Sequence, residues 1–324
     1  MIIPNPTEVK AAKTLVYVTT RDHAYTFSAW SSRMAERGIA LVMVNWEQLL
    51  TEASVPLATY VLTDFDRLSS SELEGAAHIH DRLQSQGARV YNDPKKFRPR
   101  AHLIKYLHKT GVNSYTCHLP ASGEWPHRFP VFLRTMAAHR GVLGELLHDD
   151  AACQEALEQA LLQGYPISDL AFVEFAATPV PPASTYQKLS AFRIGDHVVR
   201  ANTVNDSHWM AKTGIMGLAS PEQYRQELLE MSNYPLRHFV QQVFDAAGLE
   251  FGRLDFGVSK GRHEVYEINT NPFMSLSHDH PNPDRAAALR LMQEQLVAAF
   301  DASTPALGEG WIPLRASEQE FRRH

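Results

Sequence analysis

Three oxygen-bearing side chains and one guanidinium stand close together in GRLDFGVSKGRHEVYEINTNP, residues 252–272. Asp255 precedes a turn at Gly261, and Glu267 and Asn269 follow that turn. Two facing carboxylates repel each other unless a cation or a proton lies between them. Hard oxygen ligands suit Mg²⁺, which usually takes its remaining ligands from water and substrate phosphates. Arg253 cannot bind that metal, but it can hold a phosphate oxygen beside it.

The stretch reads as a hairpin, so its side chains should alternate between two faces. An odd number of turn residues would place Asp255 opposite Glu267, whereas an even number would put the two carboxylates on different faces. On the return strand, Val265 is expected on the face of Glu267 and Tyr266 on the other. The spacing also allows a simple solvated face with an ion pair between Arg253 and Asp255.

Composition restricts the class of protein. The 324 residues suffice for two or three compact domains, and a formal charge of −5 gives no footprint for nucleic acid. Two cysteines without a CxxC pair predict no disulfide framework and a reducing compartment. The start lacks an apolar signal region, and no stretch approaches the ~20 apolar residues of a membrane span. We therefore expect a cytoplasmic protein with no membrane partner.

Hydrophobic periodicity predicts a change of architecture along the chain. The first part should contain strands at 13–20, 39–46, 58–65 and 88–92 and helices at 24–38 and 69–87. This order is typical of a small parallel α/β domain with Rossmann-like winding, ending at the Pro-interrupted stretch 92–100.

The second part mixes helices with antiparallel strands and reads as α+β. Its expected helices are 101–111, 152–164, 235–248 and 284–300, and its expected strands include 128–135, 170–177 and a pair within 185–204 that turns at Gly195.

The segment RLDFGV…EVYEINTNP resembles the metal-binding end of the ATP-grasp superfamily, and the resemblance extends over about residues 14–300. It implies that Asp255, Glu267 and Asn269 hold Mg²⁺ against the phosphates of ATP and that Arg253 touches the terminal phosphate. It also implies a small Rossmann-like domain at 1–93 followed by a two-part ATP-grasp fold. The two parts would be a lid subdomain at 94–180 and a C-terminal subdomain at 181–324.

The same resemblance implies a nucleotide site. FPVFLRT stands where the family has a strand ending in a phosphate-binding lysine, RPRAHLIKYL resembles an earlier helix with a basic residue, and AFVEF resembles the adenine hinge. The positions that match are Arg100, Lys105, Arg134, Glu174, Phe175 and Ala176, with the backbone of the last two facing the ring.

Two polar stretches allow a functional and a structural interpretation. In NDSHWMAKTG, 205–214, Lys212 could reach a phosphate or acyl phosphate and Trp209 could wall a substrate pocket, or the segment is a surface loop. Asp64 and Asp66 end the third strand, where α/β domains place ligand-contacting residues, or they cap the following helix.

These features predict an ATP-dependent ligase that joins a carboxylate to an amine, or a similar nucleophile, through an acyl phosphate. Arg253 and Lys212 would be catalytic, ATP and Mg²⁺ would be required, the substrates would be small molecules, and analogy suggests a homodimer. Arginines in place of the family's two lysines, a thin glycine loop at 138–144, and NPFMS after the E-x-N motif keep two alternatives open. These are an ATP-binding regulatory or partner protein with weak or no ligase activity, and a phosphotransferase.

Overall fold

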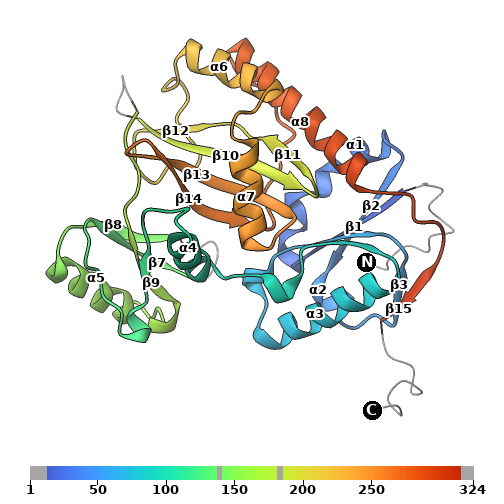
Figure 1. The fold of residues 1–324 in the computed structure, drawn as a ribbon, viewed down its shortest axis with the longest axis horizontal. Coiled ribbons are helices and arrows are strands. Elements are labelled where there is room, and N and C mark those ends of the chain that lie inside the picture. The colour runs from blue at the N-terminus through green and yellow to red at the C-terminus, as the bar shows by residue number, and fades with distance from the viewer. Residues whose placement is uncertain (1–12, 137–140, 181–184, 315–324) are drawn as a thin grey trace.

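The computed structural model describes residues 13–136, 141–180 and 185–314, and Figure 1 shows their arrangement. The strands are β1 (Lys13–Thr19), β2 (Ile39–Asn45), β3 (Ser54–Pro56), β4 (Thr59–Leu62), β5 (Arg89–Tyr91), β6 (Cys117–His118), β7 (Val131–Thr135), β8 (Val142–Leu147), β9 (Leu170–Glu174), β10 (Tyr186–Ile194), β11 (His197–Arg200), β12 (Val204–Asp206), β13 (Phe251–Ser259), β14 (Arg262–Asn269) and β15 (Trp311–Pro313). The α-helices are α1 (Ser31–Ala35), α2 (Trp46–Leu49), α3 (Ser70–Ser85), α4 (Arg100–Lys109), α5 (Asp150–Leu162), α6 (Pro221–Ser232), α7 (Arg237–Ala247) and α8 (Pro283–Ser303).

The first sheet confirms the predicted parallel α/β unit. Its order is β2-β1-β4-β5, with every pair parallel. The helix predicted at 24–38 is wrong for most of its length, because two 3₁₀ turns, Arg21–Thr26 and Ser28–Trp30, precede the short α1. Phe27, Trp30 and Met34 are nevertheless all fully buried, so the stretch has the predicted apolar face although most of its backbone is not α-helical.

The lid sheet follows in the order β6-β9-β7-β8, and α5 lies against it at the left of Figure 1. Strand β8 and helix α6 were not predicted. The central sheet runs β11-β10-β13-β14, with β12 pairing β10 at the far end of that strand. The hairpin turn predicted at Gly195 is present, with φ of 59° there.

The central sheet is buried on both faces. On one face Leu254, Phe256 and Val265 join a core that includes Val240 and Phe244 of α7. This core and the core on the α8 side both contain residues of the first sheet, and β15 returns to pair with β3. The domain bounds 1–93, 94–180 and 181–324 stay a prediction, and the first sheet shares its hydrophobic cores with the central sheet.

The β13–β14 hairpin pairs Asp255 with Glu267 as predicted, but it does so with an even-length turn and a bulge. Its turn has two residues, Lys260 and Gly261, both at positive φ, which is the turn that suits a two-residue hairpin. Such an even turn alone would separate the carboxylates. A β-bulge shifts the register between Phe256, which pairs Val265, and Asp255, which pairs Glu267.

Because of the bulge, the predicted faces of Val265 and Tyr266 are wrong. Val265 is 1 % exposed in the α7-side core, whereas Tyr266 points to the opposite side and donates a hydrogen bond to the Ala176 carbonyl at 3.1 Å. A bulge adds one residue to one strand and so reverses the alternation beyond it. Glu267 and Asn269 thereby face the same side as Asp255 and Arg253.

Replacing Gly257 with alanine should disturb this bulge, because a Cβ there would clash with Tyr266 Oη and lie 2.8 Å from its Cζ. We expect Gly257→Ala to lower the free energy of unfolding by about 1–3 kcal/mol in urea denaturation. In a Tyr266→Ala background the same change should cost little, because the ring is gone. An equal loss in both backgrounds would contradict this account of the bulge.

Candidate functional site

Asp255 is a deeply buried acid of the hairpin face, with 1 % of its surface exposed. Its carboxylate accepts hydrogen bonds from Ser190 Oγ at 2.9 Å and from Arg253 Nε and Nη2 at 2.8 and 3.1 Å. Lys188 Nζ lies 3.3 Å from Oδ2. Burial alone would raise the pKa of Asp255, but the two cations and the hydrogen bonds outweigh burial and hold that pKa below its ordinary value.

Glu267 and Asn269 stand beside this group on β14. Glu267 forms an ion pair with Arg100, at the start of α4, and Asn269 is the register partner of Arg253. Asn269 Oδ1 accepts a hydrogen bond from the Asn271 backbone N–H at 2.9 Å. Among the described residues there is no group of three or more His, Cys, Asp or Glu side chains that could hold a metal. The carboxylates of Asp255 and Glu267 and the amide oxygen of Asn269 are ligands that suit a hard cation such as Mg²⁺. Water and substrate oxygens would have to supply the rest of its coordination.

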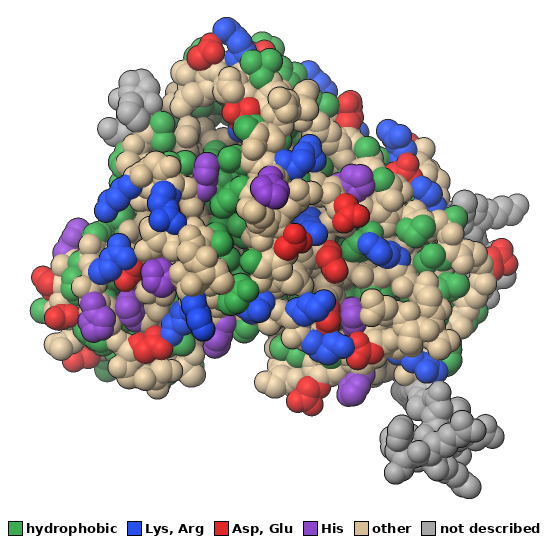
Figure 2. Space-filling model, viewed as in Figure 1, with side chains coloured by type: hydrophobic (Ala, Val, Ile, Leu, Met, Phe, Trp, Pro, Cys, Tyr) green, Lys and Arg blue, Asp and Glu red, His purple; other side chains and the backbone are tan. Residues whose placement is uncertain are grey.

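A positively charged cavity lies over these residues, between the start of α3, the start of α4 and the hairpin. Its basic lining residues are Arg98, Arg100, Arg134, Lys188, Lys212 and Arg253, and its acidic ones are Asp66, Asp255 and Glu267. Such an excess of cations raises the local concentration of an anionic ligand. On the molecular surface that Figure 2 shows, by contrast, acidic and basic side chains are interspersed.

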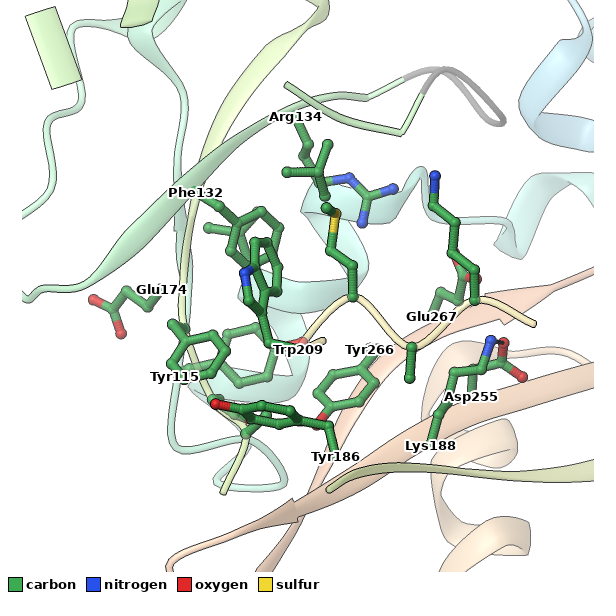
Figure 3. A pocket seen from close by; sticks show the side chains of 18 of the residues that line it. Tyr115, Phe132, Arg134, Glu174, Tyr186, Lys188, Trp209, Asp255, Tyr266 and Glu267 are labelled. Carbon is green, nitrogen blue, oxygen red and sulfur yellow. Dashed lines mark hydrogen bonds and ion pairs between the residues drawn. The ribbon is translucent and has the colours of Figure 1, made fainter. Parts of the chain in front are cut away.

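A second cavity, whose lining includes six aromatic side chains and which we call the aromatic cavity, adjoins the first. The two share six lining residues, among them Lys188, Asp255 and Glu267. The rings that line the second cavity are Tyr115, Phe132, Phe175, Tyr186, Trp209 and Tyr266. Figure 3 shows several of them gathered at one end and Lys188, Asp255 and Glu267 at the other. The arrangement can take a ligand with a planar apolar ring and a charged tail.

Some of the predicted nucleotide-binding residues line these two cavities and others do not. Arg134 lines both, and Phe175 and Ala176 line the aromatic one. Glu174 borders the aromatic cavity, but its carboxylate points away from the rings in Figure 3 and accepts from Thr116 N and pairs with His118. Lys105 forms an ion pair with Glu124 and is absent from the described lining of either cavity.

Four consecutive residues of the 205–214 segment, 209–212, line the aromatic cavity. Trp209 packs on Phe132 with ring centroids 5.0 Å apart, and His208 Nε2 lies 3.3 Å from Glu145 Oε2 of β8. Lys212 lines both cavities. Of the glycine loop predicted at 138–144, residues 138–140 lie outside the described residues, and Gly141 borders both cavities.

Two features of the site were missed or misread from the sequence. Lys188 was not singled out, although polar residues alternate at Lys188 and Ser190 in a stretch expected to be a strand, which places both on one face. The capping interpretation of Asp64 is wrong, since its side chain makes no cap hydrogen bond and instead accepts from Thr19, Thr20 and Asn271.

Comparisons with known proteins bear on the fold. No family model and no curated protein matches the chain. A structure of the ATP-grasp ligase PsnB, complexed with precursor peptide PsnA2 and AMPPNP, matches with a TM-score of 0.50 at 12% identity, over 87% of this chain and 98% of that one.

Two further structures match with lower scores. D-alanine–D-alanine ligase from Bacillus anthracis matches at TM-score 0.48 and 12% identity, over 90% of this chain and 99% of that one. The macrocyclase MdnC bound with precursor peptide MdnA, from Microcystis aeruginosa, matches at 0.48 and 14%, over 86% and 99%. At such identities the PsnB likeness shows the fold alone: the chain has an ATP-grasp fold.

The depressed pKa of Asp255 makes a prediction for stability. A carboxyl whose folded-state pKa lies below its ordinary 3.8 stabilises the fold fully above the unfolded-state pKa, and this contribution is lost as pH falls through the folded-state pKa. Asp255→Asn removes the contribution. The difference in free energy of unfolding between wild type and variant should therefore be constant above about pH 5 and shrink below about pH 4. Urea denaturation between pH 7 and pH 3 measures it, and a difference that is unchanged at pH 3 would contradict the prediction.

Proposed function

We propose that the chain is an ATP-dependent ligase that joins a carboxylate to an amine or similar nucleophile. The observation that carries this proposal is the common face of Asp255, Glu267, Asn269 and Arg253, which lies at the junction of a cationic and an aromatic cavity. The adenine ring, the triphosphate and the metal of Mg-ATP would each meet a chemically matching region in this proposal. The PsnB structure that shares the fold holds an ATP analogue, AMPPNP.

In this proposal the aromatic cavity takes the adenine, beside the Phe175–Ala176 backbone. Arg134, Lys188 and Lys212 take the phosphates, because all three line both cavities. Asp255, Glu267 and Asn269 would hold Mg²⁺, which when bound neutralises phosphate charge. Lys105 is left out of the proposed site because it is paired with Glu124.

The residues of the chain would act by orientation and charge. A carboxylate oxygen of the substrate attacks the γ-phosphorus, and the bond to the bridging oxygen of ADP breaks. Arg253, beside Asp255, stabilises the charge on the transferred phosphoryl group. The nucleophile then attacks the carbonyl carbon of the acyl phosphate, loses a proton, and displaces inorganic phosphate.

Two observations support an ATP-dependent enzyme over a protein that only binds ATP. Lys188 and Lys212 line the cationic cavity, so the arginines at the family's lysine positions do not leave the phosphates without lysine contacts. The cavity also extends beyond the hairpin to Phe65, Asp66 and Ser70, which leaves room for a second substrate.

Buried, unpaired thiols at Cys117 and Cys153 are in keeping with the cytoplasmic location included in the proposal.

Turnover with Mg-ATP and a panel of amino acids and small carboxylates, followed as ADP and phosphate release, tests the function. Asp255→Asn and Glu267→Gln should each lower turnover by at least about 100-fold, because each removes an oxygen ligand's charge from the reacting phosphates. Asp245→Asn is the matched control, since this exposed acid on α7 pairs with Arg193 and lines neither cavity.

The other outcomes identify the alternatives. Nucleotide binding without turnover across the panel would favour the ATP-binding regulatory protein, and a stable phosphorylated product would favour the phosphotransferase. Activity retained in Asp255→Asn would exclude the metal role of that residue.

A further inference from the structure

A buried polar network joins the end of the E-x-N strand to the first sheet. Its centre is Asn271, which is 6 % exposed. The side-chain Nδ2 donates to Thr19 Oγ1 at 2.7 Å and Asp64 Oδ2 at 2.9 Å. The side-chain Oδ1 accepts from Tyr17 Oη at 2.9 Å and Thr26 Oγ1 at 2.7 Å. All four hydrogen-bonding positions of the amide are therefore filled, and all four partners belong to the N-terminal part of the chain.

The same residue also contacts the proposed metal site directly. The backbone N–H of Asn271 donates to Asn269 Oδ1 at 2.9 Å. An amide side chain can present either an oxygen acceptor or an NH₂ donor, and only the oxygen can ligate a cation. A fixed N–H that binds the oxygen sets which way the amide is turned, and a second lone pair remains on that oxygen. The position of the N–H depends in turn on where the Asn271 side chain is anchored.

We propose that Asn271 is a positioning residue through which the first sheet orients the Asn269 amide for metal binding. The proposal rests on the proposed function, because it requires a Mg²⁺-dependent nucleotide site. It assigns to the N-terminal part of the chain a role in metal affinity, through four hydrogen bonds to a single buried side chain. A purely structural role would instead affect stability alone.

The test is the Mg²⁺ concentration that gives half-maximal binding of AMPPNP, measured by calorimetry on the full chain. Asn271→Ala should raise this concentration about 10-fold or more, the loss typical when a partner that orients a ligand is removed. Tyr17→Phe deletes one hydroxyl from the network and keeps the ring, so it provides a milder variant that should shift the value in the same direction.

Asn92→Ala is the matched control. Asn92 is fully buried and also ties the first sheet to the central one, through the Leu62 carbonyl and through Glu250 and Phe251 at the start of β13. Its φ of 68° makes alanine strained there, so the control should lose at least as much stability. Because it contacts no proposed metal ligand, its Mg²⁺ requirement should stay within about twofold of wild type.

A double-mutant cycle shows whether Asn271 acts through Asn269. In an Asn269→Ala background, Asn271→Ala should change the Mg²⁺ requirement by no more than about twofold. The inference is overturned if Asn271→Ala and Tyr17→Phe lower the melting temperature but leave the Mg²⁺ requirement unchanged, or if the effect persists without Asn269. Failure of the wild-type protein to bind AMPPNP with Mg²⁺ would overturn the proposed function, and the inference with it.

Discussion

The rest of the site depends on the buried carboxylate of Asp255, which needs cations and hydrogen-bond donors around it. A negative charge so far from water is tolerated only where cations and hydrogen-bond donors replace its hydration. Arg253 on the same strand and Lys188 and Ser190 on β10 supply them, and all lie on one face of the sheet. The opposite face is apolar and packs on α7. Strand register is therefore decisive, and the bulge at Tyr266 brings Glu267 onto the polar face.

Parts of the chain far apart in sequence meet at this face. The lid sheet contributes Arg134 and Phe132, which packs on Trp209, and α4 contributes Arg100, which pairs with Glu267. The first sheet reaches the same strand end through Asn271. The acids and cations neutralise one another in the structure described here, so the basic groups proposed to receive phosphate already lie beside the oxygens proposed to receive metal. Binding of Mg-ATP would therefore require Arg253 and Arg100 to release the carboxylates of Asp255 and Glu267 that they hold here.

Local patterns sufficed to predict the parallel sheet, α3, the β10–β11 turn and the hairpin that carries Asp255, because each depends on residues near in sequence. They failed where tertiary contacts decide. The two-residue turn and the bulge could not be separated from one odd-length turn by alternation alone, so Val265 and Tyr266 were assigned to the wrong faces. Lys188 lies 67 residues before Asp255 in the chain, and only the strand pairing of Ser190 with Asp255 brings it near. The ion pair that occupies Lys105 is likewise a tertiary contact.

The most direct test of the central claim is a crystal structure of the protein with AMPPNP and Mn²⁺ in place of Mg²⁺, using anomalous scattering to locate the metal. If the facing acids of β13 and β14 form the metal site, an anomalous peak will lie within coordination distance of the carboxylates of Asp255 and Glu267 and of a phosphate oxygen. A nucleotide bound in the aromatic cavity with manganese elsewhere, or with Arg253 and Arg100 still holding both carboxylates, would contradict it.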